Sequence, residues 1–400
     1  MHRIYDWGLI AKFTILSVFC ISFHSNADVK NSLVNQQFEG LIREPMTIQV
    51  VLDNGKPAIL DAFVTRPAGP GKYPIVIINH GTSESPEFDR TEMTPNRTSA
   101  TALAFATHGY AAVSLLREGY GFSSGGAEYT GGSCKEPLHK LAGKRDVRDI
   151  LAALEVIRKQ PWALPENTVL AGMSAGGFAV IATGAVNPPG VTAVISFDGG
   201  RGSIDGRSLC DRKGLLAAYS SYGKTARIPS LWLYSINDKS FPPQMGKDFF
   251  NAYHQWGADA TFMLMPAFEN NGHAFMDSAP GRFWWSHIEP FLKEHNLPYK
   301  QIVSIPENHL PMPENLNNEQ GKAAFEKYTA SELYEKAFAT GKDGAWGVAY
   351  WERDGHTAAA DAIESCEAHQ PKNAQHCNIY AINNIIVNGG QKINKPLLFK

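Results

Sequence analysis

The stretch Thr168-Val-Leu-Ala-Gly-Met-Ser-Ala-Gly-Gly-Phe-Ala-Val-Ile-Ala-Thr-Gly184 decides the fold. It opens with a short apolar run, passes through Gly-x-Ser-x-Gly, and continues in small and apolar residues. The run is typical of a strand buried on both faces, and the residues after it favour a helix. A sharp strand-to-helix turn needs glycine on either side of the serine, because side chains there would collide with neighbouring backbone. We therefore expect the turn to lift the hydroxyl of Ser174 clear of a sheet, above the positive end of a helix.

A second Gly-x-Ser-x-Gly match occurs at Gly121-Phe-Ser-Ser-Gly125. The pattern alone is a weak signal, because glycine and serine are common residues. Ser123 follows no strand directly and opens no helix, since Gly126 continues a glycine-rich loop. Context therefore predicts that Ser174 is a nucleophile and that Ser123 is a loop residue.

Apolar segments of the same continuous kind recur along the chain, separated by helical patterns. The strands are expected at 75–78, 111–116, 168–171, 193–197 and 231–234, and the helices at 98–108, 143–160, 176–185 and 243–256. Before them, alternating segments at 46–52 and 58–64 flank Asp53-Asn54-Gly55, which indicates a hairpin. Strand–helix alternation of this length predicts an α/β fold, with a mostly parallel, doubly wound sheet and helices on both faces.

A serine nucleophile needs a base, and the base needs an acid that orients it. On this kind of sheet both follow later strands, in the order serine, acid, histidine. Asp238 follows the strand at 231–234, and His273 follows a further strand at 260–265. Asp198 is the competing acid, because it too follows a predicted strand. The predicted catalytic residues are Ser174, Asp238 and His273.

Two backbone N–H groups are needed to bind the oxyanion of an acyl-transfer intermediate. We expect one from Ala175, directly after the nucleophile, and one from Thr82, in the loop that follows the strand at 75–79. The alternative for His80-Gly81 is an ordinary turn at the end of a strand. Glu118 and Arg201 are candidates for lining the substrate pocket.

Residues of about 40–297 resemble an α/β-hydrolase of the dienelactone hydrolase-like group, which grades into prolyl-oligopeptidase-type peptidase domains. The resemblance rests on Asn79-His-Gly81, Arg117-Glu-Gly-Tyr-Gly-Phe-Ser-Ser-Gly125, Gly172-Met-Ser-Ala-Gly-Gly177, Asn237-Asp238 and Asn271-Gly-His273. It implies the fold and the Ser-His-Asp triad. Dienelactone hydrolases proper carry a cysteine where this chain has Ser174, so the resemblance does not imply that substrate. Residues 336–382 resemble a small accessory domain of exported bacterial proteins.

These observations predict a serine hydrolase of the carboxylesterase type, with a small-molecule ester substrate and no cofactor or metal. The alternatives are a serine peptidase or amidase with the same triad, and a non-catalytic envelope binding protein on a hydrolase fold. The chain has 37 Lys+Arg against 39 Asp+Glu, which gives no electrostatic reason to expect a nucleic-acid partner.

Residues 1–27 have the layout of a secretory signal peptide: a basic start, an apolar run at Phe13–Phe23 and small residues before a cut after Ala27. The apolar run is shorter than the roughly 20 residues that span a bilayer, and no later stretch of sequence qualifies. We therefore expect an exported protein, periplasmic or secreted, with a catalytic domain at 28–300. A Pro-rich linker at 301–320 and a small domain at 321–400 follow it. Helices are expected at 323–339 and 357–369, and strands at 345–351 and 377–382.

Export changes the interpretation of the cysteines. Without Cys20, which lies in the predicted signal peptide, four remain, and an even number in an oxidising compartment favours disulfides. Position along the chain favours Cys134–Cys210 and Cys366–Cys377, because each pair lies within one predicted domain. The competing hypothesis is a zinc site built from Cys366-x-x-His369 and His376-Cys377.

We predict that peptide mapping without reduction recovers Cys134 linked to Cys210 and Cys366 linked to Cys377. The first link should stabilise the protein by about 4 kcal/mol in the chain-entropy model, because it closes a long loop. Free thiols, other pairings or bound zinc in the mature protein would contradict the prediction.

Overall fold

The structure of the 400-residue chain is a computed structural model. It describes residues 40–52, 55–82, 88–126, 134, 138–204, 206–342, 344–370 and 376–387. The predicted signal peptide at residues 1–27 lies outside the described residues, as do Asp53 and Asn54 of the hairpin turn.

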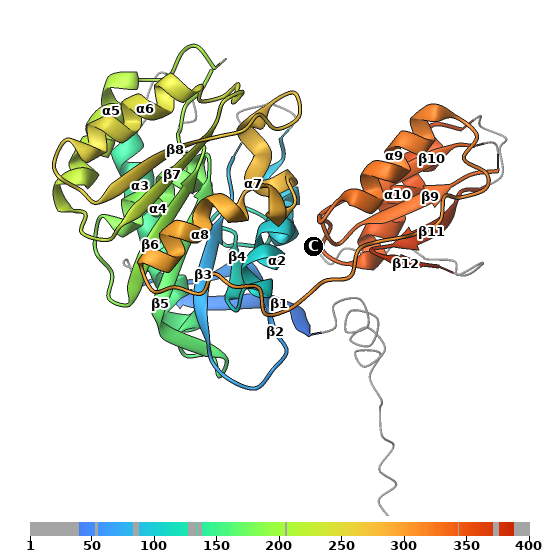
Figure 1. Cartoon of the computed structure of the whole chain (residues 1–400), viewed down its shortest axis with the longest axis horizontal. Helices are drawn as coiled ribbons and strands as arrows, with labels where there is room; N and C mark the ends of the chain where they lie inside the picture. Colours follow the sequence, from blue (N-terminus) through green and yellow to red (C-terminus); the bar gives the residue numbers. More distant parts are fainter. Residues whose placement is uncertain are drawn as a thin grey trace, which may run out of the picture.

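The first and larger sheet has eight strands in the order β1-β2-β4-β3-β5-β6-β7-β8 (Figure 1). Strand β2 is antiparallel to both neighbours, and every other pairing is parallel. The predicted mostly parallel, doubly wound sheet is thus confirmed, and the predicted hairpin is formed by β1 and β2. The strands are β1 Leu41–Val51, β2 Pro57–Pro67, β3 Tyr73–Asn79, β4 Ala111–Leu115, β5 Ala163–Met173, β6 Val191–Phe197, β7 Ser230–Ser235 and β8 Ala260–Met265.

Helices cover both faces of this sheet (Figure 1). Strand β3 shows why its apolar run is unbroken: Ile75 and Ile77 pack into one core with α3 to α6, and Val76 and Ile78 pack into the other with α2 and α8. The α-helices are α2 Ser99–Thr107, α3 His139–Ile157, α4 Ala175–Gly184, α5 Arg212–Thr225, α6 Pro243–His254, α7 Phe275–Ser278 and α8 Trp285–Glu294. Short 3-10 turns are η1 Arg90–Glu92, η2 Pro95–Thr98, η3 Gly272–Ala274 and η4 Gly281–Phe283.

The C-terminal part of the chain forms a second, four-stranded antiparallel sheet, in the order β10-β9-β11-β12. Its elements are α9 Glu319–Ala330, β9 Ala337–Thr340, β10 Trp346–Ala349, α10 Gly355–Ala368, β11 Asn378–Ile382 and β12 Ile385–Ile386. We call this part, from α9 to β12, the C-terminal unit. The helix expected over 323–339 was wrong at its end. It stops at Ala330, and residues 337–340 form a buried strand between two partners, so tertiary pairing overrides local helix propensity.

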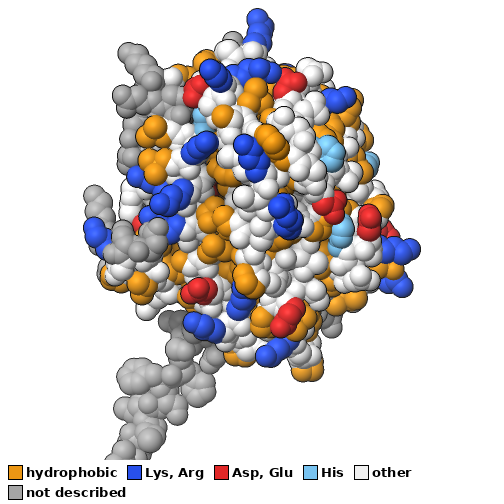
Figure 2. Space-filling view, turned by 90° about the vertical axis from the view of Figure 1, so that its left-hand side faces the viewer, with side chains coloured by type: hydrophobic (Ala, Val, Ile, Leu, Met, Phe, Trp, Pro, Cys, Tyr) orange, Lys and Arg blue, Asp and Glu red, His pale blue; other side chains and the backbone are white. Residues whose placement is uncertain are grey.

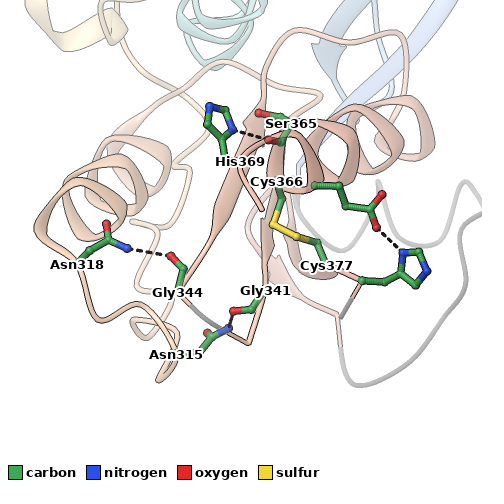
Figure 3. The surroundings of a disulfide bond; sticks show 10 residues. Asn315, Asn318, Gly341, Gly344, Ser365, Cys366, His369 and Cys377 are labelled. Carbon is green, nitrogen blue, oxygen red and sulfur yellow. Dashed lines mark hydrogen bonds and ion pairs between the residues drawn. A yellow bond between two sulfur atoms is a disulfide. The ribbon is translucent and has the colours of Figure 1, made fainter. Parts of the chain in front are cut away.

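Both predicted cysteine pairs are joined in the structure, Cys134 to Cys210 and Cys366 to Cys377. The second pair ties α10 to the residue before β11 (Figure 3). The histidines of the alternative zinc site are engaged elsewhere. The His369 ring binds the Ser365 carbonyl at 2.7 Å, and the His376 ring faces the Glu367 carboxylate at 2.8 Å. The cysteines therefore act as a staple between α10 and β11.

The segment expected to be a linker is hydrogen-bonded to both parts of the structure. It contacts α2 beside the larger sheet and the residues that follow β9 in the C-terminal unit. The N–H groups of Ile302 and Val303 donate to the carbonyl of Thr107, the last residue of α2, at 2.8 and 3.1 Å. Further along, the amide groups of Asn315 and Asn318 donate to the carbonyls of Gly341 and Gly344 (Figure 3). Backbone and side-chain bonds thus attach this segment at both of its ends. Among the described residues, no helix combines the length and the apolar character needed to cross a membrane.

A buried ion pair joins the C-terminal unit to β1. Arg43 on β1 donates to the Glu335 carboxylate at 2.6 Å, and both side chains are almost fully buried. The same guanidinium donates to Asn96 Oδ1 at 3.0 Å, and Asn96 in turn donates to the carbonyl of Glu352. Removing one member of such a pair leaves an uncompensated buried charge.

We predict that Glu335→Ala lowers the free energy of unfolding by about 3–5 kcal/mol, because Arg43 stays buried without its carboxylate. Lys322→Ala is the control, since its pair with Glu319 is exposed and should be worth under about 1 kcal/mol. Urea unfolding monitored by circular dichroism measures both. Equal losses in the two variants would show that the buried pair is not a determinant of stability.

Candidate active site

Ser174 lies at the turn between β5 and α4, with a backbone φ of +55°. This left-handed conformation is unusual for a residue with a side chain, so the turn holds the backbone in a strained geometry. Two hydrogen bonds fix the position: Ser174 N–H donates to the Phe197 carbonyl, and Gly200 N–H donates to the Ser174 carbonyl, both at 3.0 Å. The side chain is only 6% exposed.

The glycines around Ser174 are required by close approach of backbone. A Cβ added at Gly172 would lie 2.4 Å from the Gly176 carbonyl oxygen, and one added at Gly176 would lie 2.2 Å from the Asn79 carbonyl oxygen. The end of β3 and the start of α4 are therefore in direct backbone contact. This is the steric reason given above for the Gly-x-Ser-x-Gly pattern at this turn.

Ser123, the serine of the second pattern, is hydrogen-bonded to the backbone. Its hydroxyl donates to the Leu116 carbonyl at 2.8 Å and accepts from Asp61 N–H at 2.9 Å. Both bonds tie its loop to the neighbouring strands. The hydroxyl is thus occupied as donor and as acceptor.

Asp238 and His273 are brought together at the end of β7 and in η3. His273 Nδ1 lies 3.0 Å from Asp238 Oδ2. The other carboxylate oxygen, Oδ1, accepts from the N–H groups of Ser240 and Phe241 at 2.6 and 2.9 Å. Burial opposes the charge of Asp238, but the hydrogen bond and charge of His273, together with further hydrogen bonds such as that from Phe241 N–H, outweigh burial, so the pKa of Asp238 lies below its ordinary value.

Two asparagines that the sequence offered only as motif residues hold these loops together. Asn271 Oδ1 accepts from Lys239 N–H, next to Asp238, and from His273 N–H. Asn237 Nδ2 donates to the carbonyls of Phe268 and Glu269, just before the histidine loop. The sequence contained one signal for these residues, because Asn-Asp follows one strand and Asn-Gly-His follows the next. That pattern did not predict the hydrogen bonds by which the asparagines join the two loops.

Gly272, directly before His273, is required by close packing, because a Cβ added there would lie 1.9 Å from Ser235 Oγ. The residue is needed for the close approach of η3 to the end of β7. That approach is what places His273 beside Asp238.

Asp198, the alternative acid, follows β6 and is completely buried. Its Oδ1 accepts from Ser235 N–H at 2.9 Å. One oxygen from each of Asp198 and Asp238 and a ring nitrogen of His273 all lie within 4.8 Å of one another. Burial first, and then the charge of Asp238, raise the pKa of Asp198 well above its ordinary value. The hydrogen bond to the imidazole is made by Asp238, which leaves Asp198 behind it.

We assign no cofactor or metal to Asp198, Asp238 and His273. The Nδ1 of His273 is directed at Asp238, and backbone N–H groups already donate to the Asp238 carboxylate.

Among the described residues, no hydrogen bond joins the Ser174 hydroxyl to His273. Hydrogen bonds of this kind are often long before substrate binds.

The loop after β3 lies directly against Ser174. A Cβ added at Gly81 would be 3.1 Å from the Cβ of Ser174. The next residue, Thr82, accepts a hydrogen bond from the Tyr120 hydroxyl at 2.8 Å. Ala175 is the first residue of α4, where N–H groups have no partner within the helix. Both expected oxyanion residues thus belong to segments that meet at Ser174.

The two expected pocket residues are held by ion pairs. Arg201 is fully buried and its guanidinium lies 3.4 Å from Asp146. Glu118 accepts a charge-assisted hydrogen bond from Arg148. These contacts serve to hold the loops after β4 and β6 against α3.

The strand order, the Gly-x-Ser-x-Gly turn after β5, and the acid and histidine loops after β7 and β8 define the α/β-hydrolase fold. The chain therefore has the α/β-hydrolase fold that its sequence indicated.

One region of the chain matches a known protein family. Residues 55–225, less than half of the chain, match the family described as X-Pro dipeptidyl-peptidase (S15 family). No curated protein matches the chain.

Among solved structures, an acylaminoacyl peptidase of Pyrococcus horikoshii is 16% identical with a TM-score of 0.44, covering 70% of this chain and 45% of its own. Est1E from Butyrivibrio proteoclasticus, with ferulic acid bound, is 18% identical with a TM-score of 0.44, covering 63% and 99%. A puromycin-hydrolyzing peptidase of Mycobacterium tuberculosis is 17% identical with a TM-score of 0.45, covering 63% and 39%. This chain thus spans under half the length of both peptidases.

We predict that Gly176→Ala destabilises the protein by about 1–3 kcal/mol, because the added methyl group must separate α4 from the end of β3. Gly126→Ala is the matched control, since a Cβ there has nothing within 4 Å and the backbone needs no left-handed conformation. Thermal unfolding compares the two variants. A stable Gly176→Ala protein would show that the turn relaxes without cost.

Proposed function

We propose that the protein is a serine hydrolase that cleaves carboxylic esters through a triad of Ser174, His273 and Asp238. The observation that carries the proposal is the arrangement at one edge of the sheet. A serine in a strained turn at the start of a helix follows β5, and a hydrogen-bonded carboxylate–imidazole pair follows β7 and β8. Parallel strands end at the same edge, so these loops share one site.

In this mechanism the Ser174 hydroxyl attacks the ester carbonyl carbon, and its proton passes to His273 Nε2. Asp238 holds Nδ1 and so presents the other nitrogen to the serine. The oxyanion accepts hydrogen bonds from the backbone N–H groups of Ala175 and Thr82. The leaving alcohol takes the proton from His273, which gives an acyl-enzyme. Water, deprotonated by His273, then attacks the acyl group, releases the acid and restores Ser174.

Peptide or amide hydrolysis is the second candidate, because the same chemistry cleaves amides. It is favoured by one observation, the match of residues 55–225 to an X-Pro dipeptidyl-peptidase family. A non-catalytic binding protein on a hydrolase fold is the third candidate. The hydrogen-bonded pair of Asp238 and His273 makes it the least favoured of the three.

We further propose that residues 28–300 form the catalytic domain, that 301–320 connect it to an accessory domain at 321–400, and that the protein is exported. Export is supported by the sequence of residues 1–27 and by the two cysteine pairs, because disulfides persist in oxidising compartments.

Charge gives no support for a nucleic-acid partner. On one face of the molecule, Lys and Arg side chains are interspersed with acidic and uncharged residues (Figure 2). Nucleic-acid binding requires a continuous basic surface.

We predict that Ser174→Ala abolishes labelling by a fluorophosphonate probe and turnover of short p-nitrophenyl esters. Ser123→Ala, a change of the same kind in the same sequence pattern, should keep most of the activity, because that hydroxyl bonds only to backbone. Turnover of peptide amides but not of esters would favour the second candidate. Absence of labelling in the folded parent protein would favour the third.

A further inference from the structure

One oxygen of Asp198 lacks a hydrogen-bond donor among the described residues. Its Oδ1 accepts from Ser235 N–H, but Oδ2 is buried and, within the described part of the chain, has no hydrogen-bond donor. A fully buried carboxylate normally has several donors or a cation, because burial strongly disfavours the charged form. An ionised Asp198 therefore does not fit its surroundings.

The carboxylate of Asp238 makes ionisation of Asp198 still less favourable. Asp238 contributes a carboxylate from the loop after β7, and the Tyr234 hydroxyl on β7 lies nearby, bonded to the Gly199 carbonyl. His273, from η3, already gives its Nδ1 to Asp238. One oxygen of Asp198 lies within 4.8 Å of one oxygen of Asp238. Two buried carboxylates this close to each other cannot both stay ionised, so one of them holds a proton.

Asp238 is the poorer place for that proton. Its oxygens accept from two backbone N–H groups and from the imidazole, and every one of these donors favours the ionised form. Asp198 has a single backbone donor.

We propose that Asp198 is a positioning residue that stays protonated at neutral pH and donates a hydrogen bond from Oδ2 to the carboxylate of Asp238. The catalytic part of this inference rests on the proposed function, whereas the protonation state does not. The proton stays on Asp198 throughout turnover, and no group is transferred.

The bond has a specific effect on the triad. It adds a fourth donor to Asp238, after Ser240 N–H, Phe241 N–H and His273 Nδ1. The added donor fixes the plane of the carboxylate and keeps Asp238 ionised beside the imidazolium that forms during acylation. Asp198 thus acts on His273 only through Asp238.

Asparagine is the matched substitution, because its side-chain oxygen accepts from Ser235 N–H and its NH₂ group donates to Asp238. Asp198→Asn should keep kcat within about threefold of the parent value. Asp198→Ala lacks the donor and should lose about 10–100-fold in kcat, with KM unchanged, because the residue does not touch substrate. Rates are normalised to sites that react with the fluorophosphonate probe, so that misfolded protein does not count.

The pH profile separates this role from that of an ionised partner. If Asp198 were charged, Asp198→Asn would remove a negative charge near the imidazole and move the acid limb of kcat/KM to lower pH. We expect no shift. A shift of one unit or more, or a loss in Asp198→Asn as large as in Asp198→Ala, would overturn the proposal.

Protonation is measured independently of activity. The infrared difference spectrum, parent minus Asp198→Asn, should contain the carbonyl band of a buried carboxylic acid at pH 7. Stability gives a second test. The unfolded chain ionises Asp198 above the ordinary pKa of 3.8, whereas the folded protein keeps the proton, so stability falls as pH rises past that value.

Asp198→Asn has no such penalty. Its melting temperature should match that of the parent near pH 3.8 and exceed it increasingly toward pH 7. A parent protein without the acid band, or an asparagine variant less stable at pH 7, would refute the protonated state. An inactive parent that shows both signals would instead refute the proposed function and leave the proton on Asp198.

Discussion

Backbone contact between the start of α4 and the end of β3 is the constraint on which the candidate site depends. Only glycine at 172 and 176 lets the helix approach so closely, and this approach forces the intervening Ser174 into its left-handed conformation. The same contact brings Gly81 against Ser174. Ser174 and the loop expected to bind an oxyanion are therefore positioned by main chain, which has fewer ways to rearrange than side chains have.

Much of this could be read from sequence, because the signals are local. Unbroken apolar runs predicted strands buried on both faces, and the division of Ile75–Ile78 between two cores shows the physical cause. Asp238 and His273 could be selected by their place after successive strands. Parallel strands bring such places to one edge whatever the loops between them contain.

The rest depends on neighbours that are distant in sequence. The residues around Asn271 do not predict that it joins the two loops. Those around Asp198 do not predict that it lies close to Asp238. The helix expected to run on to residue 339 shows the same limit, since Ala337–Thr340 are locally compatible with a helix but lie between β10 and β11. A linker rich in proline gave no sign that it would bond to Thr107.

Helix α2 is held at both of its ends by the C-terminal part of the chain. Tyr334 N–H donates to the Ser99 hydroxyl at the first residue, and Ile302 and Val303 donate to the Thr107 carbonyl at the last. Leu103 and Ala106 between them share a core with Tyr334. A helix clamped in this way cannot leave the large sheet without releasing the smaller one, so melting of either half removes the support of the other. The two sheets are therefore expected to unfold together, in one transition.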